Sequence, residues 1–360
     1  MALNMSPMKS DLSNMVPKDQ LAHLQTISLH DLQVDSPSEQ KRLLQTCIND
    51  GFFYLDVRES TLSSRMSDLD TIFDLSKQLF SYSPEVKALF DVDRISPMKI
   101  NGYKPKGRNV VGNGKKDGFE SWVLPRNGLL QLSSDPFPHP PVIADHLRTL
   151  RYAIHGLSSA AHTILHSLST ALFLPAGQRL EDFQGLTRPS PDTLRLLKYH
   201  ANPNSNVVSQ TPHTDIGSLT FVFSTTPGLQ VLPAHIGRSS AYSESDWRYV
   251  LPKPGHAVVN IGDCISMMTN GLLKSALHRV GTVPGCDMPE RYSLAYLMRP
   301  EDQTLLRGLD SPLIPQFMSN VRNTVTSREW IQEKFTALRG EKDVSYQTDQ
   351  ILTMGRGVFI

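Results

Sequence analysis

The chain has 360 residues, of which 36 are Lys or Arg and 35 are Asp or Glu, so its formal net charge is +1. This near balance argues against a protein whose whole surface binds nucleic acid or a membrane, because such proteins usually carry a strong basic excess. Three cysteines (Cys47, Cys264 and Cys286) are odd in number and follow no metal-binding spacing. Their pattern excludes a Cys-rich zinc module and favours a reducing, cytoplasmic compartment. A chain of this length can bury a core without disulfides, which excludes a disulfide scaffold.

No run of apolar residues approaches the length needed to span a membrane. Residues 1–20 mix Ser, Pro and Met without the continuous apolar stretch of a secretory signal, and we predict a flexible tail. The length alone permits two domains, although one large β or α/β domain also fits.

The first half of the chain predicts an opening of strand, helix and strand. Residues 24–29 alternate apolar and polar, residues 36–48 have a helical apolar stripe, and an aromatic strand at 52–55 follows the turn Asp50-Gly51. Apolar residues also recur at helical spacing over 62–90, with an interruption near Pro84. Loops and short strands are expected over 91–128, and a long amphipathic helix over 143–173.

From Pro191 onward the pattern changes to six short β-like runs separated by turn residues, which favours a barrel or sandwich. The runs are 194–199, 219–223, 229–232, 257–261, 278–280 and 292–297, and a closing helix is expected over 326–338. We therefore divide the chain into the tail 1–20, a helical and strand region 21–190, a β core 191–300 and a C-terminal helical segment 301–360.

A histidine and an aspartate stand two positions apart at His213 and Asp215. In an extended segment, residues i and i+2 point to the same face, so both side chains can reach one ion. The motif alone is weak, because roughly one His-x-Asp/Glu is expected by chance in a chain with this composition. Turn residues before it and the β run 217–221 after it strengthen the prediction of a metal site.

A third ligand is expected from a distant strand, and His278 is the candidate. We expect a strand–turn–strand frame, because the β-prone residues 257–263 precede it and Asn270-Gly271 is typical of a tight turn. Two His and one carboxylate leave half of a coordination sphere open, as in non-haem Fe(II) oxygenases. Zinc hydrolases use the same ligand types, so the ligands alone do not identify the metal.

Arg291 and Ser293 open the following predicted strand and share one face. A guanidinium fork beside a hydroxyl suits a carboxylate that is held away from the metal. The Arg-x-Ser pattern by itself carries no weight, because it also occurs at 58–60, 65–67, 94–96, 188–190 and 238–240. Its place after the distal histidine makes it informative.

Taken in order, these motifs resemble the isopenicillin N synthase-type branch of the Fe(II)/2-oxoglutarate-dependent dioxygenases. The resemblance extends over residues 20–300 and also includes Gly51-Phe52-Phe53. The ordered series comprises residues 194–199, 213–215, 227–231, 260–263, 270–271, 274–280 and 291–293.

The resemblance implies an α/β fold with a mainly β core, a distorted double-stranded β-helix (jelly roll) surrounded by helices. The 360 residues are then one jelly roll with helical support. By the same resemblance His213, Asp215 and His278 would bind Fe(II) and carry the catalysis.

The cosubstrate site is likewise implied. Arg291 and Ser293 would hold the far carboxylate of 2-oxoglutarate, and Tyr199 would also contact it. The reaction would consume dioxygen, release succinate and carbon dioxide, and hydroxylate, desaturate or rearrange a small organic molecule, with ascorbate as a stimulant. We expect specialised metabolism and a monomer or weak homodimer, with no nucleic-acid or membrane partner.

The chain departs from the family pattern in two places. The family commonly has Asn-Tyr-Tyr-Pro where residues 197–200 read Leu-Lys-Tyr-His, so only the second tyrosine is kept. An extra loop at 234–246 and a longer gap between the distal histidine and the Arg-x-Ser pair can be insertions, and neither removes a ligand.

Substrate contacts are less well defined by the sequence. Tyr103, Arg108 and Phe119 lie in a segment that, by resemblance, borders the substrate mouth, and they are candidate substrate residues. The alternative is that they are loop charges and aromatic residues of a small satellite core.

Two other functions remain open at this point. Isopenicillin N synthase itself has the Arg-x-Ser motif yet does not use 2-oxoglutarate, so an iron-dependent oxidase of that type is the alternative enzyme. A catalytically silent jelly roll that binds a hormone-like ligand or a partner protein is the third hypothesis. The intact triad and the carboxylate-binding residues argue against this last one.

Overall fold

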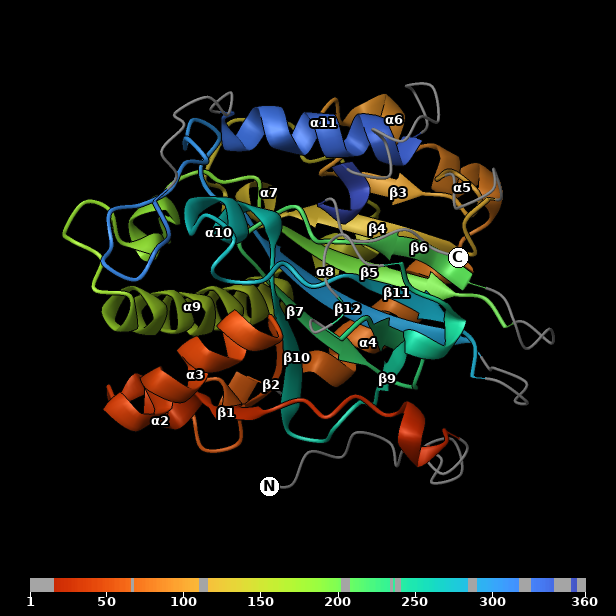
Figure 1. Cartoon of the computed structure of the whole chain (residues 1–360). Helices are drawn as coiled ribbons and strands as arrows, with labels where there is room; N and C mark the ends of the chain where they lie inside the picture. The colour runs from red at the N-terminus through yellow and green to blue at the C-terminus, as the bar shows by residue number, and fades with distance from the viewer. Residues whose placement is uncertain are drawn as a thin grey trace.

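The computed structural model consists of two β-sheets with helices around them (Figure 1). It describes residues 16–65, 68–109, 116–201, 208–233, 236, 241–283, 290–316, 325–339 and 351–354. The larger sheet has the strand order β1-β2-β10-β7-β12-β5-β4-β3, and the smaller one has the order β6-β11-β8-β9. Neighbouring strands are antiparallel except β1 and β2, which are parallel.

The strands of both sheets are short, as expected for a sandwich. Their bounds are β1 (Thr26–Ser28), β2 (Phe52–Asp56), β3 (Gly102–Lys104), β4 (Phe119–Pro125), β5 (Thr193–Tyr199), β6 (Val208–His213), β7 (Leu219–Ser224), β8 (Leu229–Val231), β9 (Arg248–Val250), β10 (His256–Ile261), β11 (His278–Gly281) and β12 (Arg291–Met298).

The helices are unequal in length. They are α2 (Leu29–Gln33), α3 (Pro37–Asn49), α4 (Asp68–Ser81), α5 (Pro84–Ala88), α6 (Val92–Ile95), α7 (Arg126–Leu130), α8 (Pro141–Asp145), α9 (Leu147–Ala171), α10 (Asp263–Met268) and α11 (Ser327–Arg339). Among the described residues, no helix has both the length and the apolar character needed to cross a bilayer.

The alternation of side-chain direction along each strand gives the large sheet two different faces. On β5, Leu194 and Leu196 join the main hydrophobic core, whereas Leu197 and Tyr199 belong to a second cluster with Phe119. Successive side chains of a strand point to opposite faces, so one face of β5 packs against helices and the other faces the space between the sheets. The inner face therefore presents Arg195, Leu197 and Tyr199 to a pocket.

The long helix α9 supports the outer face of the large sheet. Its buried stripe includes Leu150, Ile154, Leu157 and Ile164, and this spacing gives one apolar face. Ser158 on the same helix hydrogen bonds to the Tyr296 hydroxyl of β12 (2.7 Å). Figure 1 shows α2 and α3 beside α9, with α11 on the opposite side of the molecule near α6 and β3.

The sequence-based prediction of the fold is confirmed: the chain forms a mainly β core of jelly-roll type with surrounding helices. Each of the six predicted β runs contains a strand, and the predicted helices at 36–48, 62–90, 143–173 and 326–338 are present, the second broken at Pro84 as expected. The structure adds α2, α6, α7, α10, β6 and β9, and it divides the predicted helix 143–173 at His146 into α8 and α9. Strands β1–β4 complete the large sheet, so the predicted regions 21–190 and 191–300 share one sheet.

The predicted strand–turn–strand frame before His278 is wrong. The helix α10 lies between β10 and β11, and these two strands belong to different sheets. Asn270 and Gly271 do adopt positive φ (50° and 78°), but they follow the end of α10 instead of closing a hairpin. An Asn-Gly pair supplies two left-handed residues wherever a chain reverses, so its presence does not identify which elements it joins.

Several sequence predictions lie wholly or partly outside the described residues. Residues 1–15 of the predicted tail and Cys286 are among them, and the extra loop at 234–246 is described only at 236 and 241–246. The proposed boundaries of the four regions stay a prediction.

Candidate active site

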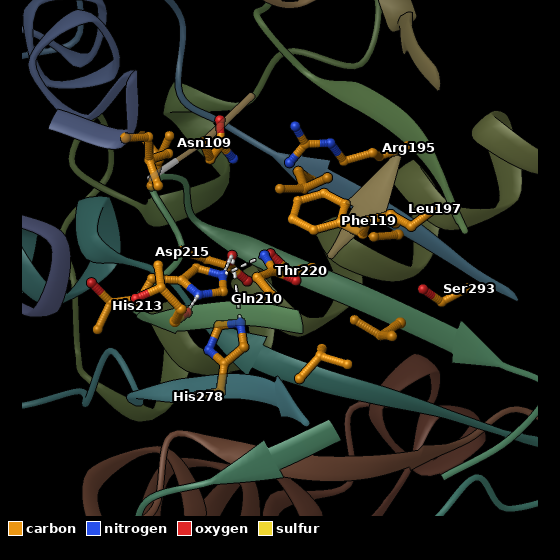
Figure 2. Close-up of a pocket in the computed structure, with 18 of the residues that line it drawn as sticks. Asn109, Phe119, Arg195, Leu197, Gln210, His213, Asp215, Thr220, His278 and Ser293 are labelled. Atoms are coloured by element: carbon orange, nitrogen blue, oxygen red, sulfur yellow. Dashed lines mark hydrogen bonds and ion pairs between the residues drawn. The ribbon is translucent and has the colours of Figure 1, made fainter. Parts of the chain in front are cut away.

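Two imidazoles and one carboxylate meet between the two sheets. His213 ends β6, His278 begins β11, and the register of the small sheet pairs them directly. The Asp215 Oδ1 atom lies 3.9 Å from His213 Nε2 and 3.8 Å from His278 Nε2. One potential ligand atom from each residue lies within 4.8 Å of the others, which is the geometry of a metal centre (Figure 2).

Backbone carbonyls orient both imidazoles. His213 Nδ1 lies 2.7 Å from the Thr211 carbonyl oxygen, and His278 Nδ1 lies 3.1 Å from that of Ala276. An Nδ1–H that donates to a carbonyl leaves Nε2 unprotonated and directed at the centre, as a metal ligand must be. Two nitrogen donors and one carboxylate oxygen are a set that suits Fe(II).

A hydrogen bond also fixes the orientation of the Asp215 carboxylate. Asn260 of β10 donates from Nδ2 to Asp215 Oδ2 (2.8 Å), which leaves Oδ1 to face the two imidazoles. Burial by itself would raise the pKa of Asp215, but His278, His213 and the Asn260 bond outweigh it and lower the pKa. Burial, with the neighbouring His278, lowers the pKa of His213. The cluster therefore has an ionised carboxylate and a neutral His213, the protonation states that bind a cation.

Close backbone packing fixes the loop after Asp215. The Asp215 carbonyl accepts from Asp263 N (2.8 Å), and the Ser218 N–H donates to the carbonyl of Met298 (2.8 Å). A Cβ on Gly217 would lie 2.1 Å from the Met298 oxygen, and one on Gly262 would lie 2.2 Å from the Gly217 oxygen. Only glycine permits these approaches, which hold the ligand loop against both β12 and the start of α10.

Gln210 connects the metal cluster to Tyr199. Its Oε1 accepts from the Tyr199 hydroxyl (2.7 Å), and its Nε2 lies 3.1 Å from His213 Nε2. The Gln210 amide thus occupies the space beside a predicted ligand atom. The sequence reasoning missed it, although its position three residues before His213 on the same strand is a usable signal.

Arg291, Ser293 and Tyr199 come together at the other end of the pocket. Arg291 pairs with Tyr199 across β12 and β5, and its guanidinium lies over the Tyr199 ring at 5.0 Å. Its Nη1 donates to Ser293 Oγ (3.2 Å), and its Nε donates to the Thr226 carbonyl (3.2 Å). Within the described parts of the chain, no carboxylate pairs with this buried cation, and burial lowers its pKa.

The three predicted substrate residues have different surroundings. Phe119 of β4 lines the pocket. The Tyr103 hydroxyl instead donates to Glu120 Oε2 (2.6 Å), and Arg108 pairs with Asp91 (2.6 Å) and Asp93. Neither Tyr103 nor Arg108 is part of the pocket lining, so the structure lends their predicted role no support.

The Glu120 carboxylate that binds Tyr103 predicts a pH dependence of stability. Lys87 Nζ lies 2.9 Å from Oε2 and His200 Nε2 lies 3.2 Å from Oε1. Burial alone would raise the pKa of Glu120, but hydrogen bonds from His200, Tyr103 and Lys87 lower it to about 2. A depressed carboxyl pKa contributes stability above its unfolded value, and this contribution is lost as the pH falls toward the folded value.

We therefore expect Glu120→Gln to lower the free energy of unfolding at neutral pH, by at most about 3 kcal/mol. The difference from wild type should shrink as the pH falls from about 5 to about 3, where the carboxylate becomes protonated in the unfolded chain. Urea unfolding at a series of pH values measures this. A difference that stays constant over that interval contradicts the assignment.

Lys334 of α11 ties the C-terminal helix to the ligand loop. Its ammonium lies 2.7 Å from Asp263 Oδ2, and both side chains are almost completely buried. The same ammonium donates to Thr214 Oγ1 (2.8 Å) and to the Leu352 carbonyl (3.1 Å). Thr214 stands between the two predicted ligands of the loop, so the helix holds this loop in place. No sequence signal pointed to this lysine.

Lys334→Met should destabilise the protein by about 3–5 kcal/mol, because it leaves the Asp263 carboxylate buried without its cation. The matched double variant Lys334→Met/Asp263→Asn removes both charges and should recover part of this loss. Urea unfolding of wild type and the two variants measures the effect. Equal stability of the single variant and wild type would show that the pair does not support the loop.

The pocket between the sheets has a largely apolar wall. Its apolar lining residues are Phe52, Phe119, Leu197, Ile216, Val222, Leu229, Val280, Ala295, Leu297, Phe335, Leu338 and Leu352. Phe335, Leu338 and Leu352 come from the C-terminal segment, so α11 closes one side of the cavity. An apolar cavity with a few convergent polar groups is typical of a small-molecule site.

Comparisons with known proteins agree with this geometry. The family model for the 2OG-Fe(II) oxygenase superfamily matches residues 191–300. A 2-oxoglutarate-dependent dioxygenase of Gibberella zeae is 30% identical over 317 residues, 87% of each chain. The 2-oxoglutarate-dependent dioxygenase gloE of Glarea lozoyensis is 30% identical over 334 residues, 92% of each chain.

Solved structures support the same fold. A full-length protein of Neurospora crassa in complex with alpha-KG and thymine has a TM-score of 0.70 at 21% identity, covering 90% of this chain and 99% of its own. JOX2 in complex with 2OG, Fe and JA has a TM-score of 0.66 at 22% identity, covering 90% of each chain. The chain belongs to the 2OG-Fe(II) oxygenase superfamily and is a 2-oxoglutarate-dependent dioxygenase, an oxidoreductase that uses Fe(II), 2-oxoglutarate and dioxygen.

Proposed function

We propose that His213, Asp215 and His278 bind the Fe(II) ion and that Arg291, Ser293 and Tyr199 bind 2-oxoglutarate. The observation that carries the proposal is the presence of both groups in one pocket. The triad offers three ligand atoms on one side of an ion. Arg291 adds a buried guanidinium that has no acidic partner among the described residues, so a dianionic cosubstrate would supply its counter-charge.

Each residue then has a defined task. The Nδ1 hydrogen bonds of the two histidines keep Nε2 free for the metal. The Asn260 amide keeps one Asp215 oxygen directed at it. The Arg291 guanidinium and the Ser293 hydroxyl would bind the carboxylate of 2-oxoglutarate that is remote from the metal.

The apolar wall excludes water from the reacting centre and holds the carbon skeleton of the substrate beside it. When bound, Fe(II) and 2-oxoglutarate supply the oxidising chemistry, and the cosubstrate leaves as succinate and carbon dioxide. The outcome for the substrate is a hydroxylation, desaturation or ring rearrangement.

An iron-dependent oxidase that does not use 2-oxoglutarate is not favoured. Relatives that match most of this chain are named 2-oxoglutarate-dependent dioxygenases. The retained Tyr199 beside Arg291 and Ser293 gives the pocket the groups expected around this cosubstrate.

We also propose that the enzyme works in specialised metabolism in the cytoplasm, as a monomer or weak homodimer, on a small molecule and without nucleic acid or membrane. The near-neutral net charge supports the absence of a polyanionic partner. The two described cysteines, Cys47 and Cys264, are buried free thiols, in keeping with a reducing compartment.

Succinate release tests the function directly. Purified protein is incubated with Fe(II), ascorbate, dioxygen and 2-oxoglutarate, with and without a panel of small organic molecules. We expect slow succinate formation alone and faster formation with a substrate. An iron-loaded protein that forms no succinate under any of these conditions would contradict the proposal.

A further inference from the structure

The pocket contains a second guanidinium without an acidic partner among the described residues, that of Arg195 on β5, whose side chain is partly buried. Arg195 shares the inner face of the strand with Leu197 and Tyr199, and all three line the cavity. Its Nε atom is buried without a hydrogen-bond partner among the described residues. In Figure 2 the side chain extends above the Phe119 ring in the direction of Asn109.

The other cationic side chains at this end of the pocket already have partners within the protein. Lys334 pairs with Asp263 (2.7 Å), and Arg339 pairs with Asp93 (3.2 Å). Arg299 donates to the Pro191 carbonyl and to Thr193 Oγ1 (3.1 Å).

Arg195 differs from these three cations. In the described residues, it has no ion pair or side-chain hydrogen bond to protein. Burial, with the nearby charges of Arg299 and Arg339, lowers the pKa of Arg195 to about 10, so it remains a cation.

Neither acid in the described part of the lining is free to pair with Arg195. The two acidic residues of the described lining are Asp117 and Asp215. Asp117 pairs with Lys104 (2.7 Å), and Asp215 belongs to the metal cluster. A cation that is partly buried and has no partner is costly, so a group that enters the pocket is expected to supply the counter-charge.

2-Oxoglutarate held by Arg291 does not meet this need. Arg291 is paired in register with Tyr199, whereas Arg195 is paired with Ala295. The two positions are four residues apart along β5, roughly 13 Å at the usual rise of a strand. The two arginines therefore enter the cavity from different positions along the sheet.

We propose that Arg195 binds a carboxylate on the primary substrate, and that the substrate is a small organic acid with an apolar skeleton. The apolar wall contributed by Phe119, Leu297, Phe335 and Leu338 fits such a skeleton, and the guanidinium fork fits its acidic end. Arg195 is then a specificity-determining residue that places one end of the substrate. This inference rests on the proposed function of the same site.

The test uses matched pairs of small carboxylic acids and their methyl esters on wild type, Arg195→Met and Arg195→Lys. Arg148→Met on the exposed face of α9 is the control. Binding is measured as a thermal shift without oxygen, with Fe(II) and saturating 2-oxoglutarate so that the Arg291 subsite is filled. Stimulation of succinate release by the same compounds is the second measurement.

At least one acid should stabilise wild type and the control and stimulate them more than its ester does. Arg195→Met should bind that acid about 10- to 100-fold more weakly, since it loses hydrogen bonds from a charged group, while Arg195→Lys keeps part of the affinity. In the Arg148→Met control, the affinity for that acid, succinate formation without substrate and the KM for 2-oxoglutarate should all stay at the wild-type values.

Two results would overturn the proposal: no acid outperforms its ester on wild type, or Arg195→Met responds to the acids as wild type does. A failure of the proposed function is a different result, because wild type would then form no succinate from 2-oxoglutarate even in the absence of substrate.

Discussion

Asp215→Ala is expected to abolish 2-oxoglutarate turnover and the retention of iron. The carboxylate is the one acidic ligand that the described residues bring to the cluster, and its Oδ1 faces both imidazoles. Loss of groups that only support a ligand typically costs about 10- to 100-fold in metal affinity, so loss of a ligand should cost more than about 100-fold. Iron content after gel filtration and succinate release measure the two effects.

Asn260→Ala provides a graded comparison within the same cluster. It leaves all three ligands in place but removes the amide that donates to Asp215 Oδ2. We expect iron affinity to fall about 10- to 100-fold and turnover to return at high Fe(II). Wild-type iron content in folded Asp215→Ala, verified by circular dichroism, would show that the metal is bound elsewhere.

Arg291→Met is expected to raise the KM for 2-oxoglutarate by about 100-fold or more. It removes a buried guanidinium that can donate two charge-assisted hydrogen bonds, each worth about 1.5–3 kcal/mol. Arg291→Lys keeps the charge but loses the planar fork, so its effect should be intermediate. Initial rates of succinate formation over a range of 2-oxoglutarate concentrations measure these changes.

The metal site provides the control for this prediction. Arg291→Met should keep wild-type iron content, because Arg291 donates to Ser293 and Thr226 and to none of the metal-binding candidates. The exposed Arg148→Met variant should leave the KM unchanged. An unchanged KM in Arg291→Met would mean that the dicarboxylate is held by other residues, and that the resemblance misassigned this arginine.

Strand prediction failed where local sequence carries little β signal. The strand β6 reads Val-Ser-Gln-Thr-Pro-His and includes Pro212, which lowers the expectation of a strand. It forms because β11 pairs with it, and this pairing brings His278 opposite His213. The three-residue strand β9 depends in the same way on β8. Such pairings are long-range contacts that no local window contains.

The residues that support the site could not all be predicted from the local sequence either. Lys334 lies 71 residues from its partner Asp263 and looks in the sequence like any charged residue of an amphipathic helix. Arg195 could have been found, since period-two alternation places it on the same face as Tyr199. The sequence does not show that both acidic residues of the described pocket lining have other partners, because those partners are supplied by the fold.

The sequence by itself determined the pairs that one stretch of chain can align, namely His213 with Asp215 and Arg291 with Ser293, and the order of motifs that identified the family. The spacing is sufficient to predict that the two side chains of each pair lie together, because side chains two residues apart in an extended chain share a face. Only the tertiary structure decided which pairs meet. The pairing of β6 with β11 and of β5 with β12 brings the triad, the Arg291 subsite and Arg195 into one cavity. Contacts between distant segments depend on sheet register and on burial against the rest of the molecule, and neither is encoded in any single segment.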